Sequence, residues 1–273
     1  MKTAPDETQP GAVPERATQA GEASPRDRDW VERHVWTERM LEALEKGVKG
    51  GVWFSLIDKV YRPSTLYAAW AGVKRNGGSG GTDRQSIEDF ERNLESEIAR
   101  LSEELRTGSY RPRPIRRAYI EKLGSKEKRP LGIPCVRDRV VQGALRIVIE
   151  PIFENVFVPH SYGFRPGRGC KDALREVERL LKAGYVHVVD ADLKAYFDTI
   201  PHGPLLADTG QYIGDGRVLE LIGAFLKQEV LEDMCLWTPE QGSPQGAVLT
   251  PRTQKITSSS CDLFHFVGRV ISG

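Results

Sequence analysis

The feature that most constrains this chain is an apolar run that ends in closely spaced aspartates. Residues 185–193 read YVHVVDADL, and alternation along a predicted strand puts Val188, Asp190 and Asp192 on one face. Two carboxylates that face the same way repel each other, and a divalent cation such as Mg²⁺, which takes oxygen ligands, removes the conflict. The pattern predicts a metal site at a strand end, and solvent-facing aspartates at such an end remain the alternative.

An Asp-x-Asp pair is also typical of metal-dependent glycosyltransferases and of phosphatases with an aspartate nucleophile. Leu193 and Lys194 follow the pair, where a phosphatase of that class is expected to have a small turn and a hydroxyl. The sequence therefore disfavours the phosphatase and leaves a metal-dependent transferase open.

Positive charge is concentrated in one part of the chain. The formal net charge of all 273 residues is only +1, but residues 105–146 hold twelve Lys or Arg against three acidic residues, a local net charge of +9. Such a segment is typical of a surface that binds a polyanion. A solvated basic face that binds nothing is the alternative on charge alone.

The amino-terminal residues and the cysteines bear on where the chain works. Residues 1–29 are rich in Pro, Gly, Ala and acidic residues, and we expect a disordered leader without a secretion signal. The four cysteines form no Cys-x-x-Cys pair, which disfavours a disulfide framework or a zinc site and fits the cytoplasm. No run approaches the roughly 18 apolar residues of a membrane span, so we expect no membrane partner.

Periodicity and breaker residues predict a mixed α+β chain. We expect helical structure from Trp30 to about residue 61 with breaks at glycines 47, 50 and 51, and a helix over 64–76 with Ser64 as N-cap. A long charged helix is predicted to end at Gly108, two short strands within 115–134, and a helix over about 137–149 that stops before Pro151. Further helices are predicted over 170–184 and 216–228, and the strand over 185–193.

Four blocks then match one known family in order. The stretch DADLKAYFDTIPH resembles the first palm motif of reverse transcriptases encoded by bacterial group II introns. The stretches YRPRPIRRAYIEKLGSKEKRPLGIPCVRDRVVQGAL, PIFENVFVPHSYGFRPGRGCKDAL and QGSPQGAVLTP resemble its other fingers and palm blocks, and GGTD at 80–83 resembles its N-terminal extension. The resemblance covers roughly residues 55–251, and it implies fingers plus part of a palm of a right-hand polymerase.

The resemblance implies roles for three residues near the aspartates. Asp192 matches the first catalytic carboxylate, which would bind two Mg²⁺ ions, with the Leu193 carbonyl completing one coordination shell. Asp190 is not assigned to metal. Phe197 matches the aromatic residue that excludes a ribose 2′-hydroxyl and so favours deoxynucleotides, although spacing alone favours ordinary core packing.

The resemblance also implies a grip on the incoming nucleotide. Lys122 and Arg129 match the fingers residues that hold the triphosphate, and Gln245 matches a glutamine that contacts the nucleotide. The glycines at 242 and 246 would let the backbone approach the substrate closely. Glu121 departs from the pattern, because the family commonly has proline there. As isolated basic residues, Lys122 and Arg129 would more often be general RNA contacts.

Six arginines are candidates for contact with RNA. In the basic segment these are Arg111, Arg113, Arg116 and Arg117, and the GFRPGRG loop adds Arg165 and Arg168 beside backbone amides and a helix start. The alternative for the loop is a capped turn without a ligand. The partners implied are an RNA template, intron RNA, a DNA primer and deoxynucleotides.

The resemblance stops after Pro251. The family continues with a Tyr-x-Asp-Asp hairpin, and no such string occurs among these 273 residues. We therefore expect four parts: the leader 1–29, fingers with N-terminal helices over 30–184, a partial palm over 185–251 and an aberrant tail over 252–273. The predicted function is RNA-directed DNA synthesis with assistance to intron splicing, truncated and inactive in isolation. The alternatives are a non-catalytic RNA-binding remnant and the metal-dependent transferase or phosphatase.

Overall fold

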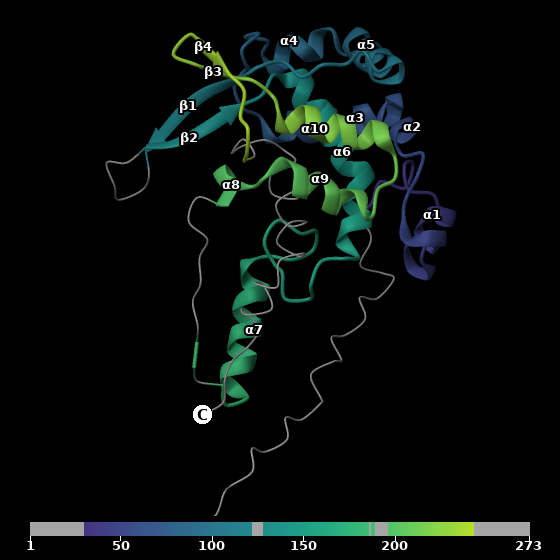
Figure 1. The fold of residues 1–273 in the computed structure, drawn as a ribbon, viewed down its shortest axis with the longest axis vertical. Coiled ribbons are helices and arrows are strands. Elements are labelled where there is room, and N and C mark those ends of the chain that lie inside the picture. The colour runs from purple at the N-terminus through teal and green to yellow at the C-terminus, as the bar shows by residue number, and fades with distance from the viewer. Residues whose placement is uncertain (1–29, 122–127, 186, 189–195, 243–273) are drawn as a thin grey trace, which may run out of the picture.

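The computed structural model describes residues 30–121, 128–185, 187–188 and 196–242 (Figure 1). Its helices are α1 (Glu38–Lys46), the 3₁₀ turn η2 (Lys49–Gly51), α2 (Ile57–Val60), α3 (Pro63–Asn76), α4 (Ile87–Arg92), α5 (Leu94–Thr107), α6 (Val136–Glu154), α7 (Cys170–Lys182), α8 (Tyr196–Thr199), α9 (His202–Gly210) and α10 (Gly216–Leu226). Its strands are β1 (Ile115–Glu121), β2 (Lys128–Ile133), β3 (Val230–Glu232) and β4 (Cys235–Trp237). This mixture confirms the predicted α+β class.

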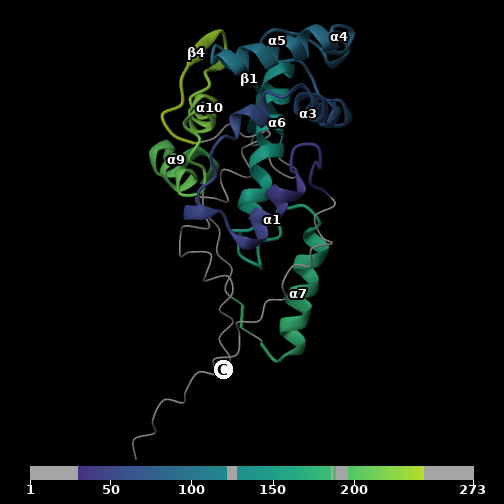
Figure 2. The same ribbon diagram turned by 90° about the vertical axis from the view of Figure 1, so that its right-hand side faces the viewer.

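Helix α6 forms the centre of the core, with α3 on one side and α9 and α10 on the other (Figures 1 and 2). Most of its residues are buried, including Val140, Leu145 and Ile149. Helix α3 crosses it closely, since a Cβ added at Gly143 would lie 3.1 Å from the Cβ of Ala69. The small residues let the two helix backbones approach each other closely.

Pro151 lies inside α6, so the predicted stop before this proline is wrong. A proline has no N–H, which leaves the carbonyl four residues earlier without its helical donor. That carbonyl belongs to Ile147, and the indole N–H of the fully buried Trp36 donates to it at 3.2 Å. The helix continues to Glu154 because a side chain from a distant segment replaces the missing donor.

The start of α3 also differs from the prediction. Arg62 occupies the N-cap position and Pro63 is the first helical residue, so Ser64 lies inside the helix rather than capping it. Proline suits this position because its φ is already helical and its missing N–H would have no partner in the first turn.

The long charged helix is divided in two at Asn93. Ser86 caps α4 in a reciprocal capping box with Asp89, and Asn93 separates α4 from α5. The predicted end at Gly108 is confirmed, because this residue is the C-cap of α5 in the left-handed conformation at φ 76°.

The sheet has the order β2-β1-β3-β4. The predicted hairpin is confirmed as β1 paired antiparallel with β2, with Arg117 opposite Gly132. Strand β3 lies parallel to β1, with Val230 opposite Ile115, and it pairs antiparallel with β4, where Trp237 lies opposite Val230. The strands β3 and β4 were not predicted. The sheet joins segments from both sides of the expected fingers–palm boundary at 184/185, and that boundary stays a prediction.

Helix α7 extends away from the rest of the described chain (Figure 1) and buries none of its residues. The predicted strand that follows it falls largely outside the described residues, as do the expected leader and tail. Within the part that the structure describes, no helix is both long and apolar enough to cross a membrane.

Candidate functional site

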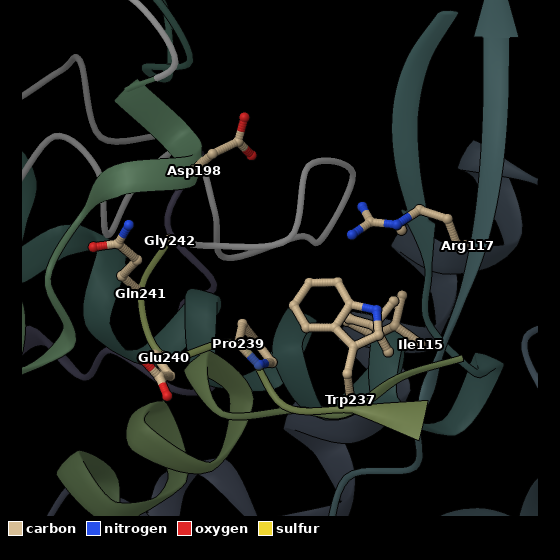
Figure 3. Close-up of a pocket in the computed structure, with 10 residues that line it drawn as sticks. Ile115, Arg117, Asp198, Trp237, Pro239, Glu240, Gln241 and Gly242 are labelled. Carbon is tan, nitrogen blue, oxygen red and sulfur yellow. The ribbon is translucent and has the colours of Figure 1, made fainter. Parts of the chain in front are cut away.

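A pocket of about 240 Å³ lies between the sheet and the loop that follows β4 (Figure 3). Ile115, Gly132 and Val230 line it from three neighbouring strands, and Arg117 and Trp237 line it from the same side of the sheet. The other lining residues come from α8 and from the loop, and they are Asp198, Pro239, Glu240, Gln241 and Gly242. The pocket therefore brings together the predicted fingers hairpin, the end of the DADLKAYFDTIPH stretch and the start of QGSPQG.

Gly242 fixes the loop against the end of α8. Its N–H donates to the carbonyl of Ile200 at 2.8 Å, and its carbonyl lies 2.7 Å from Nε2 of the buried His202. A Cβ added at Gly242 would lie 2.8 Å from the backbone oxygen of Asp198, and its φ of 83° favours glycine. The sequence predicted a close approach of this glycine to substrate, whereas the close approach in the structure is to the backbone of Asp198.

Arg117 and Trp237 form the sheet-side wall of the pocket. The guanidinium carbon lies 5.5 Å from the centre of the indole ring, which is a cation–π arrangement. Glu232 lies 3.7 Å from Nε of Arg117 and accepts a hydrogen bond from the hydroxyl of Tyr119. The bond from Tyr119 lowers the pKa of Glu232, and the charge of Arg117 and a hydrogen bond from Trp237 act in the same direction. Glu232, as a carboxylate, thus interacts with both Arg117 and Trp237 and orients them.

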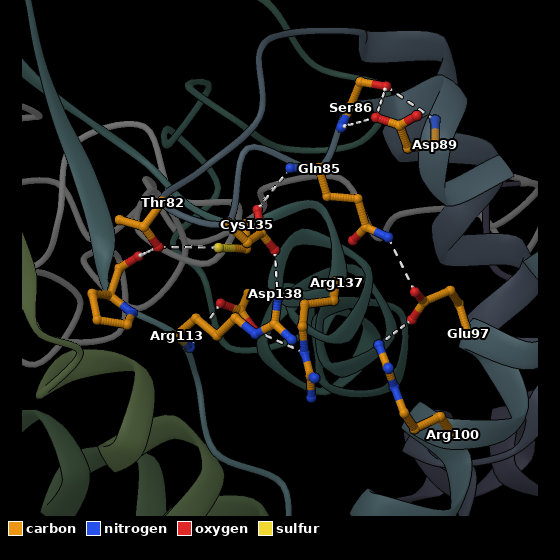
Figure 4. Close-up of polar contacts among 12 residues, drawn as sticks. Thr82, Gln85, Ser86, Asp89, Glu97, Arg100, Arg113, Cys135, Arg137 and Asp138 are labelled. Carbon is orange, nitrogen blue, oxygen red and sulfur yellow. Dashed lines mark hydrogen bonds and ion pairs between the residues drawn. The ribbon is translucent and has the colours of Figure 1, made fainter. Parts of the chain in front are cut away.

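The turn at 80–83 anchors β1 to the start of α6 (Figure 4). Thr82 donates to the carbonyl of Pro114 at 2.8 Å, and Asp83 forms an ion pair with Arg113 at 2.7 Å. A Cβ added at Gly81 would lie 2.6 Å from the backbone nitrogen of Cys135, so this turn and the helix start are in direct contact. The turn therefore sets where the sheet leaves the helical core.

A buried carboxylate joins the same strand to α6 and to the end of α10. Asp138 accepts from the hydroxyl of Tyr110 at 2.6 Å, from the backbone N–H of Arg113 at 3.0 Å and from Nε2 of Gln228 at 3.3 Å. Burial raises the pKa of Asp138 to about 6, and the Tyr110 and Arg113 hydrogen bonds and the charge of Arg137 offset part of this rise. The cluster holds β1 and the segment before β3 in register.

The chain is similar to proteins of one known family. The family described as reverse transcriptase (RNA-dependent DNA polymerase) matches residues 120–260. The chain is 35% identical over 232 residues to the group II intron-encoded protein LtrA of Lactococcus lactis subsp. cremoris, and 38% identical over 175 residues to protein YkfC of Escherichia coli K12. This chain belongs to the group II intron branch of the reverse transcriptase family.

The matches cover most of this chain and a smaller part of its relatives. The alignment takes in 84% of this chain but 38% of LtrA, and 63% of this chain but 46% of YkfC. Among solved structures, a partial Cas6-RT-Cas1–Cas2 complex has a TM-score of 0.53 at 23% identity, over 77% of this chain and 35% of that one. This likeness supports the reverse transcriptase fold.

Several of the residues assigned by the family resemblance fall outside the described residues. They are Lys122, Asp192, Leu193 and Gln245. Arg129 lies in β2 and Phe197 in α8, one residue before the pocket-lining Asp198. The roles of all six stay predictions. Among the described residues, no group of three or more His, Cys, Asp or Glu could hold a metal ion, so the predicted Mg²⁺ site depends on residues beyond them.

Each of the four arginines of the basic segment that are candidates for RNA contact has an intramolecular partner. Arg111 donates to the carbonyls of Gly108 at 2.9 Å and Tyr110 at 2.7 Å. Arg116 donates to the hydroxyl of Ser79 at 3.0 Å, whereas Arg113 pairs with Asp83, and Arg117 points to the opposite face of β1 from Arg116. The side chains of Arg113 and Arg116 hold the turn at 79–83. Replacing them would therefore affect the fold as well as the positive charge of this segment.

The two arginines of the GFRPGRG loop differ in exposure. Arg165 is buried, with an ion pair to Glu154 at 2.6 Å and hydrogen bonds to the carbonyls of Val158 and Ser161. These contacts match the capped-loop alternative. Arg168 is partly exposed, donates to the carbonyl of Pro159 and lies 6.0 Å from the ring centre of Tyr162. Its contact with RNA stays a prediction.

Sequence reasoning missed Trp237 and Glu232. Both lie in short strands whose pairing depends on β1, more than a hundred residues earlier in the sequence. The local signal is weak: in VLEDMCLW the acidic pair Glu232 and Asp233 interrupts an otherwise apolar stretch, and Asp233 and Met234 form a tight turn with positive φ.

Proposed function

We propose that this chain supplies the fingers and the first palm segment of an RNA-directed DNA polymerase of the group II intron type, which acts with RNA template, DNA primer and deoxynucleotides. The observation that carries the proposal is the meeting of three family blocks at one pocket. The amide of Gly242 at the start of QGSPQG is hydrogen bonded to Ile200 at the end of the first palm block, and Gly242 lines the pocket together with Ile115 and Arg117 of strand β1.

The proposed chemistry follows from the roles that the family resemblance gives to individual residues. Asp192, with the Leu193 carbonyl, would hold Mg²⁺, which activates a primer 3′-hydroxyl and stabilises the departing pyrophosphate. Phe197, one residue before Asp198, would contact the sugar. Lys122 and Arg129 would hold the triphosphate, and Gln245 would contact the nucleotide.

RNA is the proposed partner of the basic segment. The local net charge of +9 over residues 105–146 would attract phosphates of the template and of intron RNA. Two relatives in Arabidopsis thaliana are named nuclear intron maturases, and they match 95 and 94 residues of this chain at 35% and 34% identity. On this basis we extend the proposal to assistance in intron splicing. From the cysteine spacing of the sequence we place the chain in the cytoplasm.

A comparison of ligands tests the proposal against a metal-dependent transferase or phosphatase. The full chain is titrated with structured RNA in a filter-binding assay, and in parallel it is assayed for turnover of sugar nucleotides and phosphate esters. We expect salt-sensitive RNA binding and no turnover of either small substrate. Turnover without RNA binding would contradict the proposal.

A further inference from the structure

Trp237 is an exposed tryptophan at the edge of the sheet. Its side chain is 41% exposed, whereas Trp36 and Trp70 are 0% and 4% exposed. Trp237 ends strand β4, which among the described strands pairs only with β3. Edge strands usually carry charge or proline on their open side, because an apolar edge invites other chains. Core packing therefore does not explain a tryptophan at this position.

The indole is held in place by charged neighbours. Arg117 lies over its ring, and Glu232 interacts with both Arg117 and Trp237. The Arg117 side chain is 16% exposed, and its Nε, buried in the fold, makes no hydrogen bond to any residue that the structure describes. The guanidinium is therefore used as a flat stacking partner, with Glu232 balancing its charge at 3.7 Å.

Two acidic residues also line the pocket. Asp198 lies across it from Trp237, whereas the carboxylate of Glu240 points away from the indole (Figure 3). The rest of the lining beside the indole includes the apolar residues Ile115, Val230 and Pro239. An apolar floor next to an aromatic stack is complementary to a flat ring system.

The size of the pocket limits the ligand. Its volume of about 240 Å³ is below the roughly 300–1,000 Å³ of sites for drug-sized ligands. It suits one planar ring system, without room for a sugar and a triphosphate chain inside it.

We infer that Trp237, stacked on Arg117 and oriented by Glu232, is a platform for one unpaired nucleobase. Stacking of a base on an aromatic side chain suits single-stranded nucleic acid, because every base has a π-face. The base belongs either to the RNA strand or to a free nucleotide. This inference rests on the proposed function and extends it, since the sequence assigned Arg117 to phosphate contact and left Trp237 without a role.

Binding of short RNAs to the full chain tests the platform. The probes are a fluorescent single-stranded cytidine-rich RNA, the same RNA with abasic sugars, and free cytidine triphosphate. The variants are Trp237→Leu, which keeps apolar volume without a ring, and Trp237→Phe, which keeps a ring. Leu236→Ala is the matched control, because Leu236 is 56% exposed on the opposite face of the same strand.

We expect Trp237→Leu to weaken binding of the intact RNA about tenfold, as loss of one stacked base does, while the salt dependence stays unchanged. Trp237→Phe should recover most of the affinity, and Leu236→Ala should resemble the parent chain. Abasic RNA should bind both the parent and Trp237→Leu with equal, weaker affinity. If Trp237→Leu weakens only the binding of cytidine triphosphate tenfold, the base comes from the free nucleotide. If it weakens only the binding of RNA tenfold, the base comes from the RNA strand.

Two results separate failure of this inference from failure of the proposed function. If the parent chain binds RNA and Trp237→Leu binds intact RNA and cytidine triphosphate as tightly as the parent does, the platform is wrong and the proposed function stands. An equal loss for intact and abasic RNA would also overturn the platform, because the ring would then act on the fold and not on a base. If the parent chain binds none of the probes, both are overturned.

Discussion

The backbone amide of Gly242 donates to the carbonyl of Ile200 at 2.8 Å, and this bond joins the loop after the sheet to the segment after α8. The two residues belong to separate family blocks, and their contact closes one side of the pocket beside Arg117 and Trp237. The position of Gly242, at the start of the glycine-rich block, is therefore set by backbone geometry.

Substitution of Gly242 by alanine should destabilise the protein. The new Cβ would lie 2.8 Å from the Asp198 oxygen at a φ of 83°, and strain at such a position costs roughly 1–3 kcal/mol. Chemical denaturation of the full chain measures the change. Gly203→Ala in α9 is the control, because nothing lies within 4 Å of its Cβ and alanine favours a helix. Equal stability of the two variants would contradict the account of this contact.

Trp36→Phe should destabilise the protein through α6. Phenylalanine keeps an aromatic ring but removes the donor to the Ile147 carbonyl, and an unsatisfied buried acceptor costs about 1–3 kcal/mol. Adding Pro151→Ala in the same chain should recover part of that loss, because alanine supplies the helical N–H that proline lacks. A double-mutant cycle by denaturation gives the coupling. Independent, additive effects would show that Trp36 does not replace the proline's missing donor.

Asp138 should make stability depend on pH. Its folded pKa of about 6 lies above the ordinary 3.8, so its contribution is fully present below pH 3.8 and is lost as pH rises through 6. The size is about 3 kcal/mol, as an order of magnitude. Asp138→Asn removes the titration. Its single amide oxygen keeps an acceptor for the Arg113 N–H, and its NH2 group can donate to the Tyr110 hydroxyl. The free energy of unfolding of the parent, relative to this variant, should fall between pH 4 and 7. A relative stability that rises over this range would refute the assignment.

Replacing four arginines of the basic segment with alanine should weaken RNA binding and flatten its salt dependence. Each lost phosphate contact lowers the log–log slope by roughly 0.7 for single strands. The four residues are Arg111, Arg113, Arg116 and Arg117; we expect the first three to change the slope, whereas Arg117, stacked on Trp237, should change affinity more than slope. Binding isotherms at several salt concentrations provide the measurement.

The control for this prediction removes four equally charged side chains elsewhere. Each is exposed and ion-paired to a nearby carboxylate: Arg33, Arg92, Arg175 and Arg179. If both quadruple variants lose the same affinity, RNA is held by overall charge rather than by the basic segment. Thermal unfolding of the basic-segment variant is checked first, because Arg113 and Arg116 also brace the turn at 79–83.

Local signals accounted for much of the fold. The end of α5 at Gly108 and the hairpin of β1 and β2 were predictable, because a left-handed cap and a short turn are encoded in neighbouring residues. The extension of α6 past Pro151 was not, since it depends on Trp36 from a distant segment. The strand β3 was missed because its parallel partner β1 lies far away in the sequence.

The candidate site was predictable through family blocks and not through geometry. The blocks pointed to Phe197 and to the glycine-rich loop, and the structure brings Asp198 and Gly242 together at the pocket. The Arg117–Trp237 stack could not be predicted, because it forms across three strands whose register is set by long-range pairing. The carboxylate partners of Arg113 and Arg117 could not be predicted either, because Asp83 and Glu232 lie far from them in the sequence and approach them only in the fold.

The central claim is that Asp192 serves RNA-directed DNA synthesis with carboxylates supplied by a Tyr-x-Asp-Asp hairpin, a string that these 273 residues do not contain. Primer extension on an RNA template, with Mg²⁺ and deoxynucleotides, tests it most directly. The 273-residue chain is compared with the same chain joined to a family palm that has the hairpin, each with and without Asp192→Asn. We expect extension only by the joined chain with Asp192 intact, and RNA affinity that Asp192→Asn leaves unchanged. Extension by the 273 residues alone, or by the joined Asp192→Asn chain, would contradict the account.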